Sequence, residues 1–402
     1  MNSKVQSFLN LPTLAMTPPM GWCTWMGHYT NISESVIKEI ADIIVANGLD
    51  AVGYKYIFID EGWGYKLQNE SDHFVQNPDG SWKRTSDDTI VRDANGVKLA
   101  DATKFPNGIA AVADYVHSKG LKLGIYSSPG PLTCFNGMGS KGYEQIDANT
   151  WASWGIDGLK YDFCSYEGAN IYEGWTLMSK CLLNTGRDFL YYMCVFNKNE
   201  VYKWGAKISH AWRIGGDDNE YFNTYPSGGW GANVMDSYER ALSFAQYSMP
   251  NGWNDTEVFS MFSVHKTNTE KETNMAINCI LNLPMMLGGP LTNVSQTVVA
   301  MLKNKWLLGI HNDATHFAIR VVQDTTDIVV KQLQSGVAVM FLNKSDDDNF
   351  VYSGDLMDIL NDYNGNNYHI YDCMDNGNDL GAIGSSLNFT LLPHQSKVLK
   401  VM

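Results

Sequence analysis

The chain has few of the features that mark membrane, nucleic-acid-binding or metal-binding proteins. No apolar run approaches the ~18 residues that a transmembrane helix needs. Lysine and arginine number 29 against 43 aspartates and glutamates, and the net charge of −14 argues against nucleic-acid or anionic membrane partners. The seven cysteines form no CxxC pair, and the nine histidines form no HxH or HExxH cluster. We therefore expect no metal site and no cofactor.

Two further signatures are missing. No GxGxxG or Walker-type glycine run directly follows a predicted strand, which removes the commonest nucleotide-binding folds. Residues 1–12 show no basic region followed by an apolar core, so no signal peptide is visible. This favours a cytoplasmic location, or a secreted one if a leader precedes the sequence.

Aromatic residues, in contrast, are plentiful, with 12 Trp, 21 Tyr and 16 Phe. Their faces can stack on the apolar faces of sugar rings, which suits a carbohydrate-binding protein, although the core of a large enzyme explains any single one equally well. At 402 residues and 44% apolar content, the chain accommodates one (β/α)₈ barrel of roughly 250 residues and a small second domain.

Strand-like and helix-like segments alternate from about residue 18 to 310. Near-continuous apolar strands between amphipathic helices are typical of parallel strands buried on both faces, and about eight such units favour a closed barrel over an open sheet. The helix expected over 33–47 has a capping pair in Asn31 and Glu34 and a stop at Gly48. The expected strands cover residues 54–60, 121–127, 155–162, 189–196, 208–213, 252–255 and 283–287.

The pattern changes after about residue 315. Short strand-like segments over 328–333, 336–342, 368–371 and 387–392 are separated by Asn, Asp, Gly and Ser turns. They predict a catalytic barrel over 14–315 and an antiparallel β-sandwich over 316–402. The polar stretch 64–98 is a long excursion after the second strand, and we expect it to help build a substrate pocket unless it is a tolerated surface insertion.

Several carboxylates fall where a barrel strand ends. They are Asp60, Glu61, Asp162, Asp217 and Asp255. One acid at a strand end is weak evidence, because salt bridges and helix caps explain most of them. Five on the same face of one barrel indicate a glycosidase, which needs one carboxyl group to attack or direct water and another to protonate the leaving oxygen.

The sequence resembles glycoside hydrolase family 27, the α-galactosidase or melibiase family, over nearly its whole length. The similarity includes the first-strand motif, the presumed nucleophile strand, the acid/base segment and the C-terminal turn. The matching stretches are Met20–Trp25 (MGWCTW), Phe105–Ile109 (FPNGI), Tyr115–Tyr126 (YVHSKGLKLGIY), Leu159–Cys164 (LKYDFC), Trp212-Arg213 with Asp217, Gly252–Asp255 (GWND), Pro284-Met285 and Pro393–Gln395 (PHQ).

This resemblance implies a retaining exo-glycosidase that hydrolyses terminal α-D-galactosidic bonds through a covalent glycosyl-enzyme. Asp162 would be the nucleophile and Asp217 the general acid/base. The resemblance also implies an oligosaccharide or glycoside partner and leaves a homo-oligomer open. Substrate-binding residues would be Trp25, Asp60, Glu61, Tyr126, Lys160, Cys194, Arg213 and Asp255. Lys160 and Arg213 have a simpler interpretation as ion-pair partners of the two catalytic aspartates.

The resemblance implies a disulfide between Cys134 and Cys164, behind the nucleophile, if the protein meets an oxidising compartment. Cys194 matches another half-cystine of the family. Ser209 stands where its partner would be, so we expect Cys194 to be free.

Three departures from the family pattern affect the identity of the sugar more than the class of reaction. After the second strand, Asp-Asp-Cys-Trp becomes Asp60–Trp63 (DEGW). After the fifth, Cys-Glu-Trp becomes Cys194–Phe196 (CVF), which puts the contact to the sugar's 2-position in doubt. The later Trp-Asn-Asp-Pro-Asp becomes Trp253–Glu257 (WNDTE).

The sequence is therefore also compatible with activities other than that of an α-galactosidase. Glu61 is one methylene longer than the family's Asp and would reach toward the space of the sugar's hydroxymethyl group, which favours a β-L-arabinopyranosidase. An α-glucoside hydrolase of the isomaltodextran type is a further alternative within the family, and an N-acetylgalactosaminidase is disfavoured. From a different class, a catalytically silent galactoside-binding barrel is disfavoured by the retention of both Asp162 and Asp217.

Overall fold

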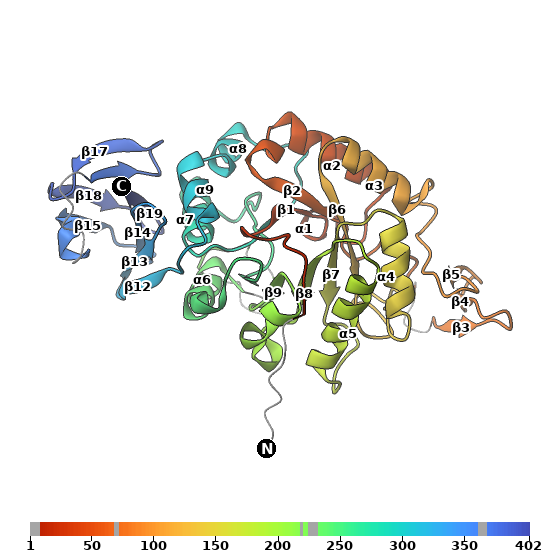
Figure 1. Cartoon of the computed structure of the whole chain (residues 1–402). Coiled ribbons are helices and arrows are strands. Elements are labelled where there is room, and N and C mark those ends of the chain that lie inside the picture. The colour runs from red at the N-terminus through yellow and green to blue at the C-terminus, as the bar shows by residue number, and fades with distance from the viewer. Residues whose placement is uncertain (1–8, 68–71, 218–219, 224–231, 361–367) are drawn as a thin grey trace, which may run out of the picture.

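The computed structural model describes residues 9–67, 72–217, 220–223, 232–360 and 368–402. The first eight residues, which carry part of the signal-peptide prediction, lie outside this range. Figure 1 shows a parallel barrel with helices around it, a small three-stranded sheet at one side and a C-terminal β domain at the other.

Eight parallel strands form the barrel, in the hydrogen-bonded order β10-β9-β8-β7-β6-β2-β1-β11. Their bounds are β1 Met20–Cys23, β2 Tyr54–Phe58, β6 Lys122–Ser127, β7 Gly158–Asp162, β8 Leu190–Cys194, β9 Ala211–Arg213, β10 Trp253–Asp255 and β11 Met285–Gly288. The sheet closes between β10 and β11 through Phe259, which pairs in parallel with Leu287. Its N–H donates to the carbonyl of Met286 at 2.7 Å. The seam between β10 and β11 is therefore made by residues beyond the end of β10.

The barrel strands bury both faces, as their apolar sequences predict. Outward side chains such as Trp22 and Ile57 join the large core beneath the helices, whereas the inward neighbours Cys23 and Phe58 join a separate cluster inside the barrel. The Phe58 ring needs room on the neighbouring strands. A Cβ on Gly124 would come within 2.4 Å of that ring, so the barrel interior requires glycine there.

Nine helices are present among the described residues. They are α1 Trp25–His28, α2 Glu34–Ala46, α3 Gly108–Ser118, α4 Glu144–Ser153, α5 Ile171–Asn184, α6 Val234–Ser243, α7 Asn268–Ile280, α8 Gln296–Leu302 and α9 Lys305–Asn312. Helix α2 fits the sequence prediction except at its start. Its N-cap is Ser33, whose hydroxyl accepts from the Val36 N–H, and Glu34 instead binds Asn107, so the predicted Asn31–Glu34 pair is not the cap.

The excursion after β2 forms a three-stranded antiparallel sheet of β3 Phe74–Gln76, β4 Trp82–Arg84 and β5 Ile90–Arg92. Arg92, which is fully buried, ties it to α4 through two bonds to Asp147 at 2.6 and 2.8 Å. None of its described residues lines the pocket at the barrel mouth, so the prediction that it builds that pocket is wrong for this part of the chain. These residues instead form the three-stranded sheet and attach it to α4.

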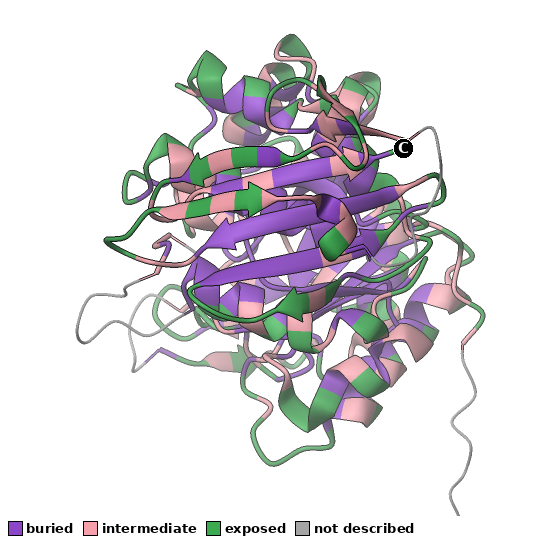
Figure 2. Ribbon diagram, turned by 90° about the vertical axis from the view of Figure 1, so that its left-hand side faces the viewer, coloured by how far each residue is buried: buried purple, intermediate pink, exposed green. Residues whose placement is uncertain are grey.

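The C-terminal domain contains a six-stranded antiparallel sheet, β12-β13-β14-β19-β16-β17, and a two-stranded sheet, β15-β18. Strand β14 is buried throughout, and Figure 2 shows buried strands crossing the centre of the domain between more exposed ones. Residues of both sheets share one apolar cluster. The bounds are β12 Ile319–Val322, β13 Thr326–Gln332, β14 Val337–Asn343, β15 Phe350–Gly354, β16 His369–Asp372, β17 Asn378–Ala382, β18 Leu387–Leu391 and β19 Ser396–Val401.

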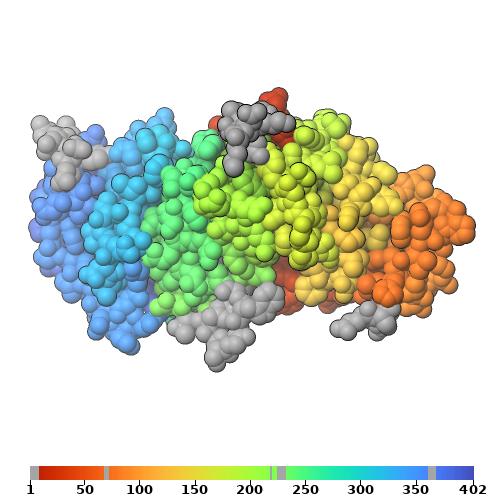
Figure 3. Space-filling view, turned by 90° about the horizontal axis from the view of Figure 1, so that it is seen from below, coloured from red at the N-terminus to blue at the C-terminus, as the bar shows by residue number. Residues whose placement is uncertain are grey.

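The β domain packs against the barrel helices. Strands β14 and β19 contact α7, and Lys331 on β13 donates to the carbonyl of Ile310 on α9 at 2.7 Å. Figure 3 shows this domain at one end of an elongated surface and the β3–β5 region at the other. Among the described residues, no helix has both the length and the apolar character needed to cross a bilayer.

Candidate active site

A pocket of about 380 Å³ opens where the barrel strands reach their carboxyl ends. Parallel strands all deliver their final side chains to this edge, which is where barrel enzymes place their reactive groups. The lining residues come from the ends of β6, β7 and β9 and from the segments that follow β1, β2, β6, β7, β8, β9 and β10. They are Trp25, Asp60, Glu61, Tyr126, Cys134, Phe135, Lys160, Asp162, Phe163, Phe196, Arg213, Asp217 and Glu257.

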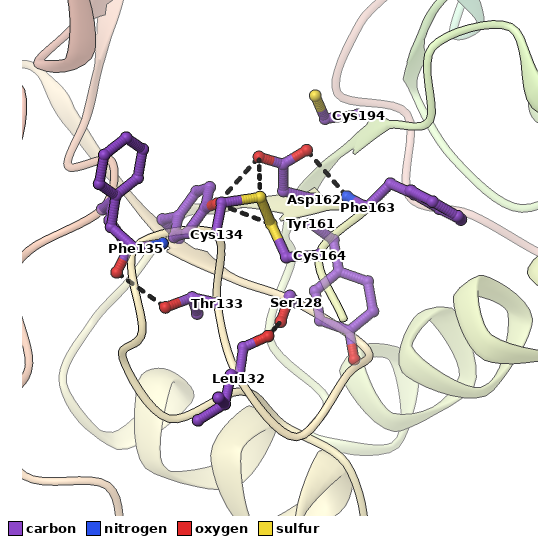
Figure 4. Close-up of a disulfide and its surroundings, with 12 residues drawn as sticks. Ser128, Leu132, Thr133, Cys134, Phe135, Tyr161, Asp162, Phe163, Cys164 and Cys194 are labelled. Carbon is purple, nitrogen blue, oxygen red and sulfur yellow. Dashed lines mark hydrogen bonds between the residues drawn. A yellow bond between two sulfur atoms is a disulfide. The ribbon is translucent and has the colours of Figure 1, made fainter. Parts of the chain in front are cut away.

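Asp162, the last residue of β7, is held from two sides. Its Oδ2 accepts the Tyr126 hydroxyl at 2.8 Å, and its Oδ1 accepts the Phe163 N–H at 2.8 Å. The side chain is buried but still lines the pocket. Figure 4 shows the Asp162 carboxylate beside Phe163, with the disulfide of Cys134 and Cys164 beneath it. Two fixed donors leave the carboxylate little rotational freedom.

The structure joins Cys134 and Cys164 in a disulfide that links the segments following β6 and β7. Cys134 Sγ lies 3.9 Å from Asp162 Oδ2, and Cys164 Sγ lies 3.4 Å from the Tyr126 hydroxyl. Cys134, Asp162 and Cys164 also form the one close group of three metal-binding residue types found among the described residues. Both sulfur atoms are taken up by the disulfide, so this group offers no thiolate ligand.

Lys160 on β7 and Asp60, which follows β2, form a buried ion pair at the base of the pocket, across the intervening strand β6. Lys160 Nζ lies 2.6 Å from Asp60 Oδ2, which also accepts the Cys23 thiol at 3.3 Å. Burial alone would lower the pKa of Lys160, but the charges of Asp60 and Glu257 outweigh it and raise that pKa well above its usual value. Lys160 is therefore a fixed cation facing the pocket, and its partner is Asp60 rather than Asp162.

Arg213, at the end of β9, connects two carboxylates. Its Nη2 lies 2.6 Å from Asp217 Oδ1, and its Nη1 pairs with Glu257. Nη1 also contacts Cys194 Sγ at 3.1 Å. The Asp217 side chain is 43% exposed, whereas that of Glu257 is 5% exposed, so only Asp217 stands free toward the pocket opening.

Glu257 occupies an unusual position. Its φ of 92° lies in the left-handed region, where the backbone of any residue other than glycine is strained. Burial raises the pKa of Glu257 to about 7, against the opposing charges of Arg213 and Lys160. Its neighbour Asp255 is also buried, and burial raises the pKa of that carboxyl too. Burial and the two neighbouring cations therefore act on the Glu257 carboxyl in opposite directions.

Glu61 is buried at the wall formed by the segment after β6. Its Oε1 accepts the Thr133 hydroxyl at 2.8 Å, and its Oε2 accepts the Phe135 N–H at 3.3 Å. Burial raises the pKa of Glu61, and the nearby Lys98 opposes this rise. Both carboxylate oxygens are therefore anchored to the same loop that carries Cys134.

Cys134 of the predicted disulfide lines the pocket, and so do eight of the ten predicted catalytic and substrate-binding residues: Trp25, Asp60, Glu61, Tyr126, Lys160, Asp162, Arg213 and Asp217. Two others lie beneath it. Cys194 is buried and free, and it reaches the pocket only through Arg213. Asp255 lines a small cavity inside the barrel together with Tyr192 and Met286.

Four lining residues were not predicted as site residues: Phe135, Phe163, Phe196 and Glu257. For Glu257 a signal existed, because it stands two residues beyond Asp255 in a strand-end motif. Phe196 covers Arg213, with the guanidinium 4.5 Å from the ring centre. Phe135 and Phe163 directly follow Cys134 and Asp162, so their place depends on loop geometry that the sequence does not show.

Known proteins resemble this chain in both sequence and structure. The family model described as Alpha galactosidase A (Melibiase_2) matches residues 17–84 and 79–313. Alpha-galactosidase 2 of Arabidopsis thaliana is 35% identical over 318 residues, which are 79% of this chain and 72% of the relative. The crystal structure of α-galactosidase I from Mortierella vinacea superposes with a TM-score of 0.85 at 30% identity, covering 97% of this chain and 98% of that one.

One structural neighbour has a different printed activity. A β-L-arabinopyranosidase from Geobacillus stearothermophilus has a TM-score of 0.77 at 20% identity, covering 96% of this chain and 96% of that one. At this identity the likeness shows a shared fold and does not distinguish between sugars.

Proposed function

Because the chain belongs to glycoside hydrolase family 27, the α-galactosidase or melibiase family, we propose that it hydrolyses terminal α-D-galactosidic bonds with retention of configuration. The observation that carries this proposal is the pairing of two unlike aspartates in one pocket. Asp162 is buried and held by two donors, and Asp217 is half exposed and bound by Arg213. The fixed Asp162 carboxylate suits attack on the anomeric carbon. Asp217 suits proton transfer to the leaving-group oxygen and from the attacking water.

In the first step, the Asp162 carboxylate attacks the anomeric carbon while the bond from that carbon to the leaving oxygen breaks. Asp217 gives its proton to that oxygen. Arg213 engages Oδ1 of Asp217, so the transferred proton is carried on Oδ2. The Tyr126 hydroxyl, bound to Asp162 Oδ2, keeps the nucleophile aimed and lets the new ester form without a change of rotamer.

In the second step, water replaces the aglycone. Asp217, now a carboxylate, takes a proton from the water, whose oxygen attacks the anomeric carbon and releases Asp162. Two inversions at one carbon return the starting configuration, so α-galactose is the first product. Arg213 stabilises the Asp217 carboxylate in this half of the reaction, and Glu257 on its other side balances the charge of the guanidinium.

Sugar recognition is assigned to the base and wall of the pocket. The Lys160–Asp60 pair presents a cation and an anion to adjacent hydroxyls, and we assign the axial 4-hydroxyl of galactose to Asp60. Trp25 stands at the wall, where its ring can cover the apolar face of the sugar. Cys194 and Phe196 contact Arg213 on the side that we assign to the 2-position of the sugar.

A panel of 4-nitrophenyl glycosides tests this function. We expect the highest kcat/KM for the α-D-galactoside and at least roughly 10²-fold less for the α-D-glucoside, because a buried group that binds a hydroxyl rejects the isomer lacking it. The α-N-acetylgalactosaminide should be a poor substrate. Nuclear magnetic resonance should show the α-anomer as the first product. Binding of galactose without cleavage of any glycoside would instead identify a silent binding barrel.

A second candidate activity, on β-L-arabinopyranosides, is favoured by Glu61. α-D-Galactose and β-L-arabinopyranose differ by the hydroxymethyl group at C5, and an acid longer by one methylene takes up space on that side. Because Thr133 and Phe135 hold both oxygens of Glu61, the longer side chain stays at the pocket wall. An α-glucosidase receives no such support, since Asp60 is in place for an axial hydroxyl.

We expect Glu61→Asp to raise the ratio of galactoside to arabinopyranoside efficiency by roughly tenfold, because shape differences of one methylene are worth ~1–3 kcal/mol. The measurement is kcat/KM on the two nitrophenyl sugars. Glu61→Gln is the matched control, since it keeps the length of the side chain and should leave the ratio near that of the wild type. An unchanged ratio in Glu61→Asp removes the idea.

We propose that the chain consists of a catalytic unit over 14–315 and a small β-sandwich over 316–402 that stabilises it. The gap between α9 and β12 and the apolar cluster shared by the two C-terminal sheets support this division. The substrate partner is an oligosaccharide or other glycoside. A homo-oligomer is compatible with exposed apolar residues on the edge strand β12, among them Ile319 and Val321.

A further inference from the structure

The C-terminal domain contacts the segment that follows Asp217. The Asn223 side-chain amide donates to Asp346 Oδ1 at 2.9 Å, and His394 Nε2 lies 2.8 Å from the same oxygen. Asn223 belongs to the barrel, whereas Asp346 and His394 belong to the β domain. One carboxylate oxygen of the β domain therefore holds a side chain from the acid/base loop.

His394 is itself fixed by the barrel. Its Nδ1 lies 2.8 Å from Glu270 Oε1 on α7, and its carbonyl accepts the Thr273 hydroxyl at 2.8 Å. The ring also packs on Phe222, with ring centres 4.7 Å apart. The imidazole thus bridges α7, the β domain and the segment that contains Phe222.

Residues 221–222 form backbone hydrogen bonds with residues 234–235, which lie just beyond the residue that binds the Asp217 carbonyl. Val234 and Met235 donate their N–H groups to the carbonyls of Tyr221 and Phe222, both at 3.0 Å. Next to them, the Ala232 N–H donates to the carbonyl of Asp217 at 2.7 Å. A shift of residues 221–223 is therefore transmitted through 232–235 to the main chain that carries Asp217.

We propose that Asp346 and His394 are positioning residues for Asp217, so that the C-terminal domain sets the placement of the general acid without touching the substrate. This inference rests on the proposed role of Asp217. Asp217 projects from a loop, and within the described part of the chain Arg213 is the partner that holds its side chain. As the general acid it must meet the leaving oxygen within hydrogen-bonding distance. The contact through Asn223 restricts the backbone from which it projects.

The effect should depend on the leaving group. An alkoxide needs its proton during bond cleavage, whereas a dinitrophenolate departs without one. Misplacing the acid therefore slows cleavage of melibiose, a galactosyl-glucose disaccharide, and spares 2,4-dinitrophenyl α-galactoside. A merely structural role of Asp346 would slow both substrates alike.

The test compares kcat/KM on these two substrates for variants of the full chain. We expect Asp346→Ala to lower the value for melibiose by roughly tenfold and to change that for the dinitrophenyl sugar by less than about twofold. Asp346→Asn should restore activity, since its amide oxygen still accepts from Asn223. Asn223→Ala should reproduce the loss, and the double variant should add nothing further.

Two controls make the result decisive. Asp347→Ala removes the same charge from the neighbouring exposed position and should match the wild type. Asp217→Ala shows how a true loss of the acid appears on the two substrates. If it lacks leaving-group dependence, the role of Asp217 itself fails. If it has that dependence and Asp346→Ala changes neither substrate, or both equally at an unchanged melting temperature, the positioning role is overturned.

Discussion

Replacing Asp162 with asparagine is expected to lower kcat on 4-nitrophenyl α-galactoside by roughly 10⁴–10⁶-fold, the scale seen when other enzymes lose a covalent nucleophile. An amide keeps the shape of the carboxylate and can still accept the Tyr126 hydroxyl, but it lacks the charge needed to attack carbon. Because the change is nearly isosteric, the melting temperature should move little. Steady-state kinetics together with thermal unfolding give the measurement.

A rescue experiment separates this role from a general disturbance of the pocket. Asp162→Gly in the presence of azide should convert an α-galactoside into the β-configured galactosyl azide, because the small anion enters from the face that Asp162 vacates. Asp114→Asn, an exposed aspartate on α3, is the control and should retain full activity. Full activity in Asp162→Asn would refute the assignment.

The second large effect is expected at Asp217. In Asp217→Ala, kcat/KM for melibiose should fall by roughly 10²–10⁴-fold, the usual contribution of general acid catalysis, while kcat/KM for dinitrophenyl galactoside, which reports the first step, should stay close to the wild-type value. Arg213 would lose one partner and keep Glu257.

The activated substrate offers a second check on Asp217. With cleavage unimpaired and water no longer deprotonated, the glycosyl-enzyme should accumulate, and an initial burst of dinitrophenol should precede a slow steady state. A uniform loss on both substrates would mean that Asp217 binds the sugar and does not transfer protons.

Much of this site could be predicted because strand ends and motif order are local properties of the sequence. The expected barrel is confirmed by its eight parallel strands, and the family is confirmed by the family model and relatives. Asp60, Lys160 and Asp162 reach one pocket because parallel strands place their last residues at one edge. The resemblance to the family then identified which of the acids and bases at strand ends belong to the site.

Other features depended on geometry that no sequence pattern states. Asp255 ends a strand as Asp162 does, yet it turns into the barrel interior, where Tyr192 and Met286 leave a small cavity. Phe135 lines the pocket because the disulfide of Cys134 fixes its loop. The contact of Asp346 with Asn223 joins residues 123 positions apart across two domains. Long-range pairings of this kind follow from the completed fold and not from local spacing.

The closure of the barrel at Phe259 has an evolutionary consequence. Between β10 and this residue, positions 256–258 lie outside the named strands, so the alternation that fixes side chains elsewhere in the sheet does not govern them. Glu257 turns into the pocket from this stretch with a positive φ, which a regular strand would forbid. Related sequences can therefore differ at 256–258 without any change in the hydrogen-bonding register of a barrel strand.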